Sequence, residues 1–343
     1  MWFTSDNASG AAPQIMAALA RANEGYARSY GADPIMDRVR GRIRTLFEAP
    51  EAAVYLVATG TAANALALAL YSAPWTAIFA HETAHIAVDE CGAPEFYTNG
   101  SKLIPVGGTH GKMTPETLAA AMGRVVQGDV HSVQRGMLSI TNVTETGTVY
   151  SPAEVAALAA LAKSRGMHCH LDGARFANAL VATGATAAAM TWKAGIDVVS
   201  FGGTKNGCLG VEAVVIFDPA KAWEFELRRK RGGHLFSKHR MLSAQMEAYL
   251  TDGLWLRLAG QANAMGSALA RGLAGVAGAK LMHPAQANMI FAEWDPGTHA
   301  RAEAKGAVFY PWPAAQGREA ARLVASWSTT EADVDGLIAS LRG

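Results

Sequence analysis

Two short segments of this 343-residue chain carry residues that could do chemistry together. Asp172 follows the apolar stretch 167–171, and Lys205 follows the apolar stretch 198–200 after a Gly-rich turn. Lys205 lies 33 residues after Asp172, which is about the length of one strand–helix–strand unit. In a right-handed crossover of that kind both strand ends lie on one edge of the sheet. The spacing therefore predicts that the two side chains face one crevice.

A carboxylate and an amine placed in this way suit pyridoxal phosphate (PLP). The lysine can form a Schiff base with the cofactor's aldehyde, and the carboxylate can keep the pyridine nitrogen protonated so that the ring accepts electrons. The alternative is a surface lysine and a helix-capping aspartate, as most Lys and Asp residues are. Residues elsewhere in the chain favour the cofactor.

The run Gly60-Thr61-Ala62-Ala63-Asn64 follows a predicted strand and opens a predicted helix. Small residues at such a junction let backbone N–H groups and the helix dipole face an anion. A cofactor phosphate could bind there, with the Thr61 hydroxyl as a further donor. An ordinary N-capped helix is the alternative.

The run His81-Glu82-Thr83-Ala84-His85 matches the zinc-peptidase pattern H-E-x-x-H. It comes directly after a predicted strand, so His81 is expected to precede the helix rather than share a face with His85. We expect no metal here. The position favours His85 alone, stacked on a flat cofactor, over a purely structural histidine.

Arg322 enters an apolar strand near the end of the chain. A buried arginine must be paired, and a bidentate bond to a substrate carboxylate would satisfy it. Ser5 and Arg175 are plausible helpers. An intramolecular ion pair is the alternative for Arg322.

The order of elements predicts an α/β fold with two unequal domains, residues 1–253 and 254–343. Strands are predicted at 53–57, 77–80, 102–106, 137–141, 167–171, 198–200 and 213–217, separated by helices, which indicates a large, doubly wound, mostly parallel sheet. The smaller α+β domain is predicted to hold a helix at 256–273, strands at 280–282, 289–293, 308–311 and 323–326, and a helix at 331–342.

Composition excludes several function classes. Half of the residues are apolar, and 30 basic against 29 acidic residues leave a net charge of +1, which does not favour nucleic acid or an anionic membrane as a partner. We see no signal peptide and no stretch of the ~20 apolar residues that span a bilayer. Three cysteines without a pairing pattern are typical of a cytoplasmic protein.

Taken together, the chain resembles the low-specificity L-threonine aldolases of the β-eliminating lyase family, which are PLP enzymes with the aspartate-aminotransferase fold. The resemblance covers nearly the whole chain, and its sharpest piece is Leu171-Asp172-Gly173-Ala174-Arg175. The other matching pieces, in chain order, are Ser5-Asp6, Tyr30-Gly31-Ala32-Asp33-Pro34, Gly60-Thr61-x-x-Asn64, His85 with Glu90-Cys91-Gly92, Asn178-Ala179, Lys205 and Arg322-Leu323-Val324.

The resemblance implies a role for each matching residue. Lys205 would bind the cofactor covalently, Asp172 would pair with the pyridine nitrogen, and His85 would stack on the ring. The remaining cofactor contacts would come from Gly60, Thr61, Arg175, Thr204 and Lys238, and the substrate contacts from Ser5, Tyr30, Arg175 and Arg322. The family further implies a homodimer or homotetramer with shared active sites.

Two segments depart from the family pattern. Many members have Asn-Thr-His-Asn where this chain has Asn142-Val143-Thr144-Glu145-Thr146, so the usual histidine is missing. Many also have Gly-Gly-Gly-Met-Arg in a segment from the neighbouring subunit, where this chain has the longer run 232–238 ending in Lys238. The side-chain pocket and the subunit contact therefore differ from the family.

The function expected from this resemblance is cleavage of L-threonine, L-allo-threonine or related β-hydroxy-α-amino acids such as phenylserine to glycine and an aldehyde. The base could be His85 or Glu145. The alternatives are another PLP-dependent lyase or an aminotransferase, and a zinc hydrolase using His81, Glu82 and His85.

Overall fold

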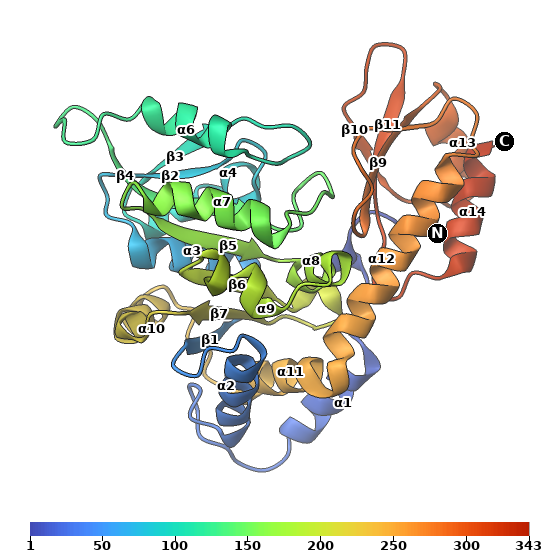
Figure 1. The fold of residues 1–343 in the computed structure, drawn as a ribbon. Coiled ribbons are helices and arrows are strands. Elements are labelled where there is room, and N and C mark those ends of the chain that lie inside the picture. Colours follow the sequence, from blue (N-terminus) through green and yellow to red (C-terminus); the bar gives the residue numbers. More distant parts are fainter. Residues whose placement is uncertain (343) are drawn as a thin grey trace.

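The computed structural model describes residues 1–342. Seven strands form one sheet in the order β1-β7-β6-β5-β4-β2-β3 (Figure 1). In chain order they are β1 (Ala53–Val57), β2 (Thr76–His81), β3 (Lys102–Val106), β4 (Gln134–Thr141), β5 (His168–Gly173), β6 (Val198–Gly202) and β7 (Glu212–Ile216). β7 is antiparallel to both of its neighbours, β1 and β6, and all other neighbouring pairs are parallel. Residues 203–211, which join it to β6, are too few for the helical crossover that a parallel strand needs. The prediction of a mostly parallel sheet is confirmed.

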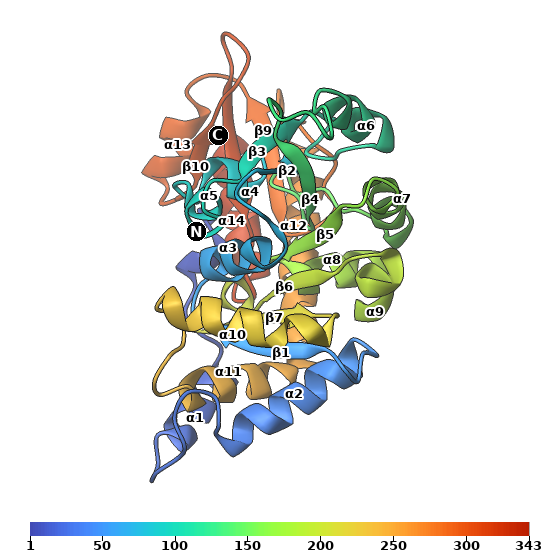
Figure 2. The ribbon, with the colours of Figure 1, turned by 90° about the vertical axis from the view of Figure 1, so that its left-hand side faces the viewer.

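Helices cover both faces of this sheet (Figure 2). One face packs against α3 (Gly60–Tyr71) and α10 (Ala222–Arg231), with the short α4 (His85–Val88) and α5 (Ala93–Tyr97) nearby. The helices of the other face are α1 (Pro13–Ala22), α2 (Pro34–Leu46), α6 (Pro115–Gly123), α7 (Pro152–Lys163), α8 (Phe176–Thr183), α9 (Ala187–Met190) and α11 (Arg240–Leu250).

Alternation along the strands explains why both faces are covered. In β1, Val54 and Leu56 join the core under α2 and α11, whereas Tyr55 and Val57 join the core under α3. Successive strand residues point to opposite faces, so an all-apolar strand needs a helical layer on each side.

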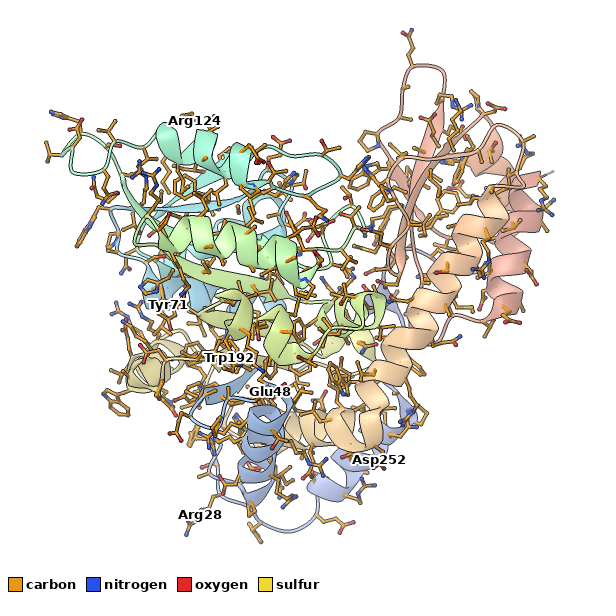
Figure 3. The ribbon with its side chains drawn as sticks, viewed as in Figure 1. Arg28, Glu48, Tyr71, Arg124, Trp192 and Asp252 are labelled. Atoms are coloured by element: carbon orange, nitrogen blue, oxygen red, sulfur yellow. The ribbon has the colours of Figure 1, made fainter. Side chains whose placement is uncertain are left out.

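The second unit is built on α12 (Leu254–Leu273), the long helix that runs away from the large sheet (Figure 1). Its antiparallel sheet has the order β10-β11-β9-β8, and its elements are β8 (Lys280–Leu281), β9 (Met289–Trp294), α13 (Thr298–Ala304), β10 (Tyr310–Trp312), β11 (Glu319–Val324) and α14 (Glu331–Arg342). Figure 3 marks Asp252 at the turn between α11 and α12, where its φ is 51°.

The chain's first residues join this second unit. The Phe3 N–H donates to the Val308 carbonyl oxygen at 2.7 Å, and the Phe3 side chain is fully buried among residues of α12, β9, β11 and α14. A boundary between 253 and 254 remains our proposal for the domains, with Met1 to Phe3 packed on the second one. Within residues 1–342, no helix combines the length and apolar character that crossing a membrane requires.

The elements that carry the predicted chemistry meet as the crossover rule requires. β5 and β6 are parallel neighbours, with Asp172 paired with Ser200. A 3-10 turn, η3 (Thr204–Asn206), follows β6 and carries Lys205. Glycine is needed at Gly202 because a Cβ atom there would lie 2.4 Å from the Ala174 carbonyl oxygen. The ends of β5 and β6 therefore approach closely, and both side chains reach one place.

Candidate active site

Asp172 and Lys205 line one pocket of about 230 Å³. The loops and helix starts that follow the strands supply its walls, which are formed by Asn7, Ala58, Thr59, Gly60, Thr61, Asn64, His85, Glu90, Glu145, Asp172, Ala174, Thr204, Lys205 and Glu212. Six of the residues predicted to hold the cofactor lie here together, namely Gly60, Thr61, His85, Asp172, Thr204 and Lys205, and Glu145, the alternative base, lies here as well. A pocket at the carboxyl ends of parallel strands is the usual place for a ligand in this architecture.

Asp172 is held by two hydrogen bonds. The Ala174 N–H donates to its Oδ1 at 3.0 Å, and the Asn64 Nδ2 donates to its Oδ2 at 2.9 Å. The same Asn64 amide nitrogen donates to Glu90 Oε1 at 2.9 Å. Asn64 thus couples two buried carboxylates, and both are fixed in orientation before any ligand arrives.

His85 is tied into this network from the other side. Its Nδ1 lies 2.9 Å from Glu90 Oε1, and this hydrogen bond raises the pKa of His85 against the lowering effect of burial. Glu90 is buried and orients the ring, a role that the sequence alone did not suggest. His85 begins α4 whereas His81 ends β2, so the two do not stand one turn apart on a helix as the zinc-peptidase pattern requires.

The first turn of α3 forms the opposite wall. The Thr59 side chain caps the helix by accepting the Ala62 N–H at 3.2 Å. Gly60 and Thr61 are the first residues of the helix, so their N–H groups have no carbonyl partner within it. A Cβ atom at Gly60 would meet no protein atom within 4 Å. The helix therefore presents N–H groups and open space to the pocket, as an anion site does.

Glu212 supports the lysine turn from β7. The Gly203 N–H donates to its Oε2 at 2.8 Å, and the Thr204 hydroxyl Oγ1 accepts the Val211 N–H at 3.1 Å. Burial raises the pKa of Glu212 to about 7, although hydrogen bonds from Thr204 and Gly203 oppose the rise. Glu212 was not picked out in the sequence, because a glutamate at the start of an apolar strand gives no signal.

Arg175 does not line this pocket and is paired with Asp6. Its Nε donates to Asp6 Oδ2 at 2.6 Å and its Nη2 donates to Asp6 Oδ1 at 2.9 Å, and both side chains are buried. Burial alone would raise the pKa of Asp6, but the charge and hydrogen bonds of Arg175 outweigh it, so this pKa is lowered. The neighbouring Ser5 Oγ accepts the Asn7 N–H at 3.1 Å.

Arg322 approaches from β11 of the second unit. Its Nη2 donates to the Thr4 carbonyl oxygen at 3.3 Å, and its guanidinium lies 5.1 Å from the centre of the Tyr310 ring. Its Nε is buried and makes no hydrogen bond to residues 1–342. Among residues 1–342, Arg322 forms no ion pair of the kind that the sequence left open. The charges of Arg175, Glu145 and Asp6 lie near enough to act on its pKa, which burial lowers.

Comparison with known proteins identifies the relatives of this chain. The family model described as beta-eliminating lyase matches residues 3–295. This chain belongs to the beta-eliminating lyase family. Among curated proteins, a low specificity L-threonine aldolase from Pseudomonas sp. (strain NCIMB 10558) is 42% identical over 340 residues, which cover 99% of this chain and 96% of that protein.

Solved structures with the same fold were also found. A threonine aldolase from Leishmania major superposes with a TM-score of 0.94 at 29% identity, covering 99% of this chain and 98% of that one. An aspartate aminotransferase from Rhodobacter sphaeroides, at 18% identity, has a TM-score of 0.71 and covers 100% of this chain and 90% of that one. The second likeness concerns the fold alone, and it confirms the predicted aspartate-aminotransferase-like architecture.

The pocket of this lyase-family chain fits PLP by the chemistry of its donors. A lysine and a buried carboxylate line the pocket together with the N-terminus of α3, where the space beside Gly60 is open. These groups match an aldehyde, a pyridine nitrogen and a phosphate respectively.

Tyr30 and Lys238 lie away from this pocket. Both are exposed, and the Tyr30 N–H donates to the carbonyl oxygen of Ser237 at 3.1 Å. The Tyr30 turn and the segment 232–238 therefore lie side by side on the surface. The ring of Tyr30 lies 5.1 Å from the Lys230 Nζ.

Proposed function

We propose that this chain is a PLP-dependent carbon–carbon lyase that cleaves L-threonine, L-allo-threonine or related β-hydroxy-α-amino acids such as phenylserine to glycine and an aldehyde. The observation that carries the proposal is the meeting of Asp172 and Lys205 in one pocket. The 42% identity to a low specificity L-threonine aldolase gives that pocket its reaction class.

Four parts of the pocket would hold the cofactor. Lys205 would bind the aldehyde through its amine, and Asp172, already oriented by Asn64, would accept the pyridine N–H. The ring of His85 would stack on the cofactor ring. The first turn of α3, with Gly60 and Thr61, would receive the phosphate together with Thr204.

The substrate carboxylate would be bound by cations at the boundary of the two units. Arg322 has a buried Nε without a partner among residues 1–342 and lies near the Arg175–Asp6 pair. With Nε and Nη2 of Arg175 engaged by Asp6, its Nη1 stays available as a second donor. Ser5 would add a hydroxyl. Together they would fix the carboxylate so that the Cα–Cβ bond stands perpendicular to the cofactor ring.

When bound, PLP supplies a ring that takes up the electron pair of the broken Cα–Cβ bond. The protein must keep the pyridine nitrogen protonated for this purpose, which a buried carboxylate in a fixed orientation does well. A base must also accept the proton of the β-hydroxyl group as the bond breaks.

We also propose that the enzyme is cytoplasmic and acts as a homodimer or homotetramer with shared sites. The three cysteines are free, as is usual in a reducing compartment. On the surface near the Tyr30 and Lys238 segments, α5 and α10 expose Phe96, Trp223 and Leu227, with exposed fractions of 76%, 71% and 52%. Clusters of large exposed apolar side chains mark interaction surfaces, and a second copy of the chain fits a family with shared sites.

The test is product analysis with PLP-loaded protein and L-threonine. We expect acetaldehyde and glycine in equal amounts, with no production by the Lys205→Ala variant. Release of a keto acid without glycine would indicate transamination, and release of ammonia with a keto acid would indicate β-elimination. Either result would overturn the proposal.

A further inference from the structure

Among the carboxylates that line the pocket, Glu145 is the one to which the site described above gives no role. Glu145 lies in the loop after β4 and lines the pocket beside Asp172 and Lys205. Burial is the main effect on the pKa of Glu145 and raises it, and nearby charges have smaller effects. No hydrogen bond within residues 1–342 contributes to the shift. The charged groups close enough to interact with it are Lys205, Arg175, Asp172, His85 and Arg322.

The loop that carries Glu145 is braced on both sides. The Thr144 and Thr148 hydroxyls lie 2.7 Å apart, and the Thr148 hydroxyl donates to the His110 carbonyl oxygen at 2.6 Å. Gly147 has a φ of 81°, and a Cβ atom there would lie 2.2 Å from the Met289 carbonyl oxygen in the second unit. The backbone on either side of Glu145 is therefore held in place, and with it the position from which the carboxylate enters the pocket.

The loop is also packed against the second unit through apolar side chains. Val143 and Val149, which flank the loop, are buried with Met289, Phe291 and Val324 of β9 and β11. A rigid support of this kind is what a catalytic group requires, because a displacement of about 1 Å can cost on the order of a hundredfold in rate.

His85 already has a different role in the proposed site. Glu90 engages its Nδ1 and raises its pKa. Its anchored ring suits contact with the cofactor face. For Glu145, burial raises the pKa above the ordinary glutamate value, and a higher pKa makes a carboxylate a stronger base.

From this geometry, and resting on the proposed function, we propose that Glu145 is the base that accepts the proton of the substrate's β-hydroxyl group. As the Glu145 O–H bond forms, the hydroxyl O–H electrons become the second bond of the aldehyde carbonyl. The Cα–Cβ bond would break, and the bound cofactor would supply the electron-accepting ring that takes up its electron pair. Protonation of Cα then completes glycine, so that one proton moves in net terms from the β-oxygen to Cα. The carboxylate takes the place of the histidine that many family members carry in this loop.

The test compares Glu145→Gln with His85→Asn in PLP-loaded protein, with Glu116→Gln as a control that removes an exposed carboxylate on α6. Two reactions are followed, which are cleavage of L-threonine and exchange of the α-proton of glycine in D2O. The exchange has no β-hydroxyl group to deprotonate. General-base catalysis typically contributes about 10²–10⁴-fold, so Glu145→Gln should lower kcat for cleavage by that factor and leave exchange within about threefold.

The pH profile gives a second readout. In the wild type, kcat should fall as the pH drops through a pKa above the ordinary glutamate value, because the base must be deprotonated. This fall of kcat at low pH, the acid limb of the profile, should be absent in Glu145→Gln and present in His85→Asn. Glu145→Asp keeps a carboxylate, so it should show the same limb with a lower kcat.

Each other outcome is decisive. Cleavage by Glu145→Gln within about threefold of the wild type would overturn the proposal, as would loss of the limb in His85→Asn alone. Equal loss of cleavage and exchange in Glu145→Gln would reassign Glu145 to a structural role. A wild type that neither cleaves L-threonine nor exchanges glycine would contradict the proposed function itself.

Discussion

Replacing Asp6 with asparagine should be among the most destabilising single changes in the site. The side chains of Asp6 and Arg175 are only 1% and 6% exposed, and two hydrogen bonds join them. Asparagine keeps the shape but removes the charge, which leaves a buried guanidinium without compensation. Breaking a buried pair in this way costs about 3–5 kcal/mol. We expect a loss of that size in the free energy of unfolding at pH 7.

Urea denaturation of cofactor-saturated protein, followed by circular dichroism, measures this loss. Asp37→Asn is a matched control, because Asp37 also binds an arginine, Arg40, at 2.9 Å but is 73% exposed. A surface pair of that kind contributes about 0–1 kcal/mol.

The pH dependence follows from the lowered pKa of Asp6. A carboxyl group with a depressed pKa in the folded state stabilises the protein above its unfolded-state pKa and loses this contribution as the pH falls through the folded-state value. The difference between Asp6→Asn and wild type should therefore be complete at pH 7 and shrink below about pH 4, near the ordinary aspartate pKa. A loss no larger than that of Asp37→Asn at pH 7 would refute the reasoning.

Three further predictions concern the cofactor. Asp172→Asn should retain bound PLP but cleave L-threonine at least tenfold more slowly, where tenfold corresponds to about 1.4 kcal/mol of barrier; a kcat within about twofold would remove Asp172 as the pyridine partner. Treatment with a chelator should leave activity unchanged, whereas one zinc ion per chain together with loss of activity on chelation would revive the reading of His81 and His85 as ligands. Lys238→Ala should weaken PLP binding in equilibrium dialysis more than it lowers thermal stability, because a cation from a neighbouring subunit would stabilise the phosphate; unchanged PLP affinity would exclude Lys238 from the site.

The sequence predicted the main sheet well because its strands are continuous apolar runs. β1 and β3 match their predicted bounds, and α14 does as well. Helix α11 was missed because polar residues interrupt its buried face. Ser243 and Gln245 are buried there, bonded to Asp33 and to the N–H groups of Leu209 and Gly210. Partners far away in the sequence make such residues acceptable inside a protein, and periodicity cannot reveal them.

The candidate site, too, could be predicted from the sequence only in part. Topology alone brings Asp172 and Lys205 together, since parallel neighbouring strands end on one edge. The contacts that orient the site residues could not be predicted in this way. Asp6 and Arg175 are 169 residues apart in the sequence, and the links from Asn64 to Glu90 and Asp172 join three separate segments. These contacts depend on how whole elements pack, which neither spacing nor residue type specifies.

The most direct test of the account is to find where the cofactor is attached. PLP-loaded protein would be treated with borohydride, which makes the bond between a lysine amine and the cofactor aldehyde permanent, and then digested and analysed by mass spectrometry. We predict one modified peptide, with the cofactor on Lys205, and none from Lys205→Ala. Modification of a different lysine in the wild type, or no modification at all, would contradict the account.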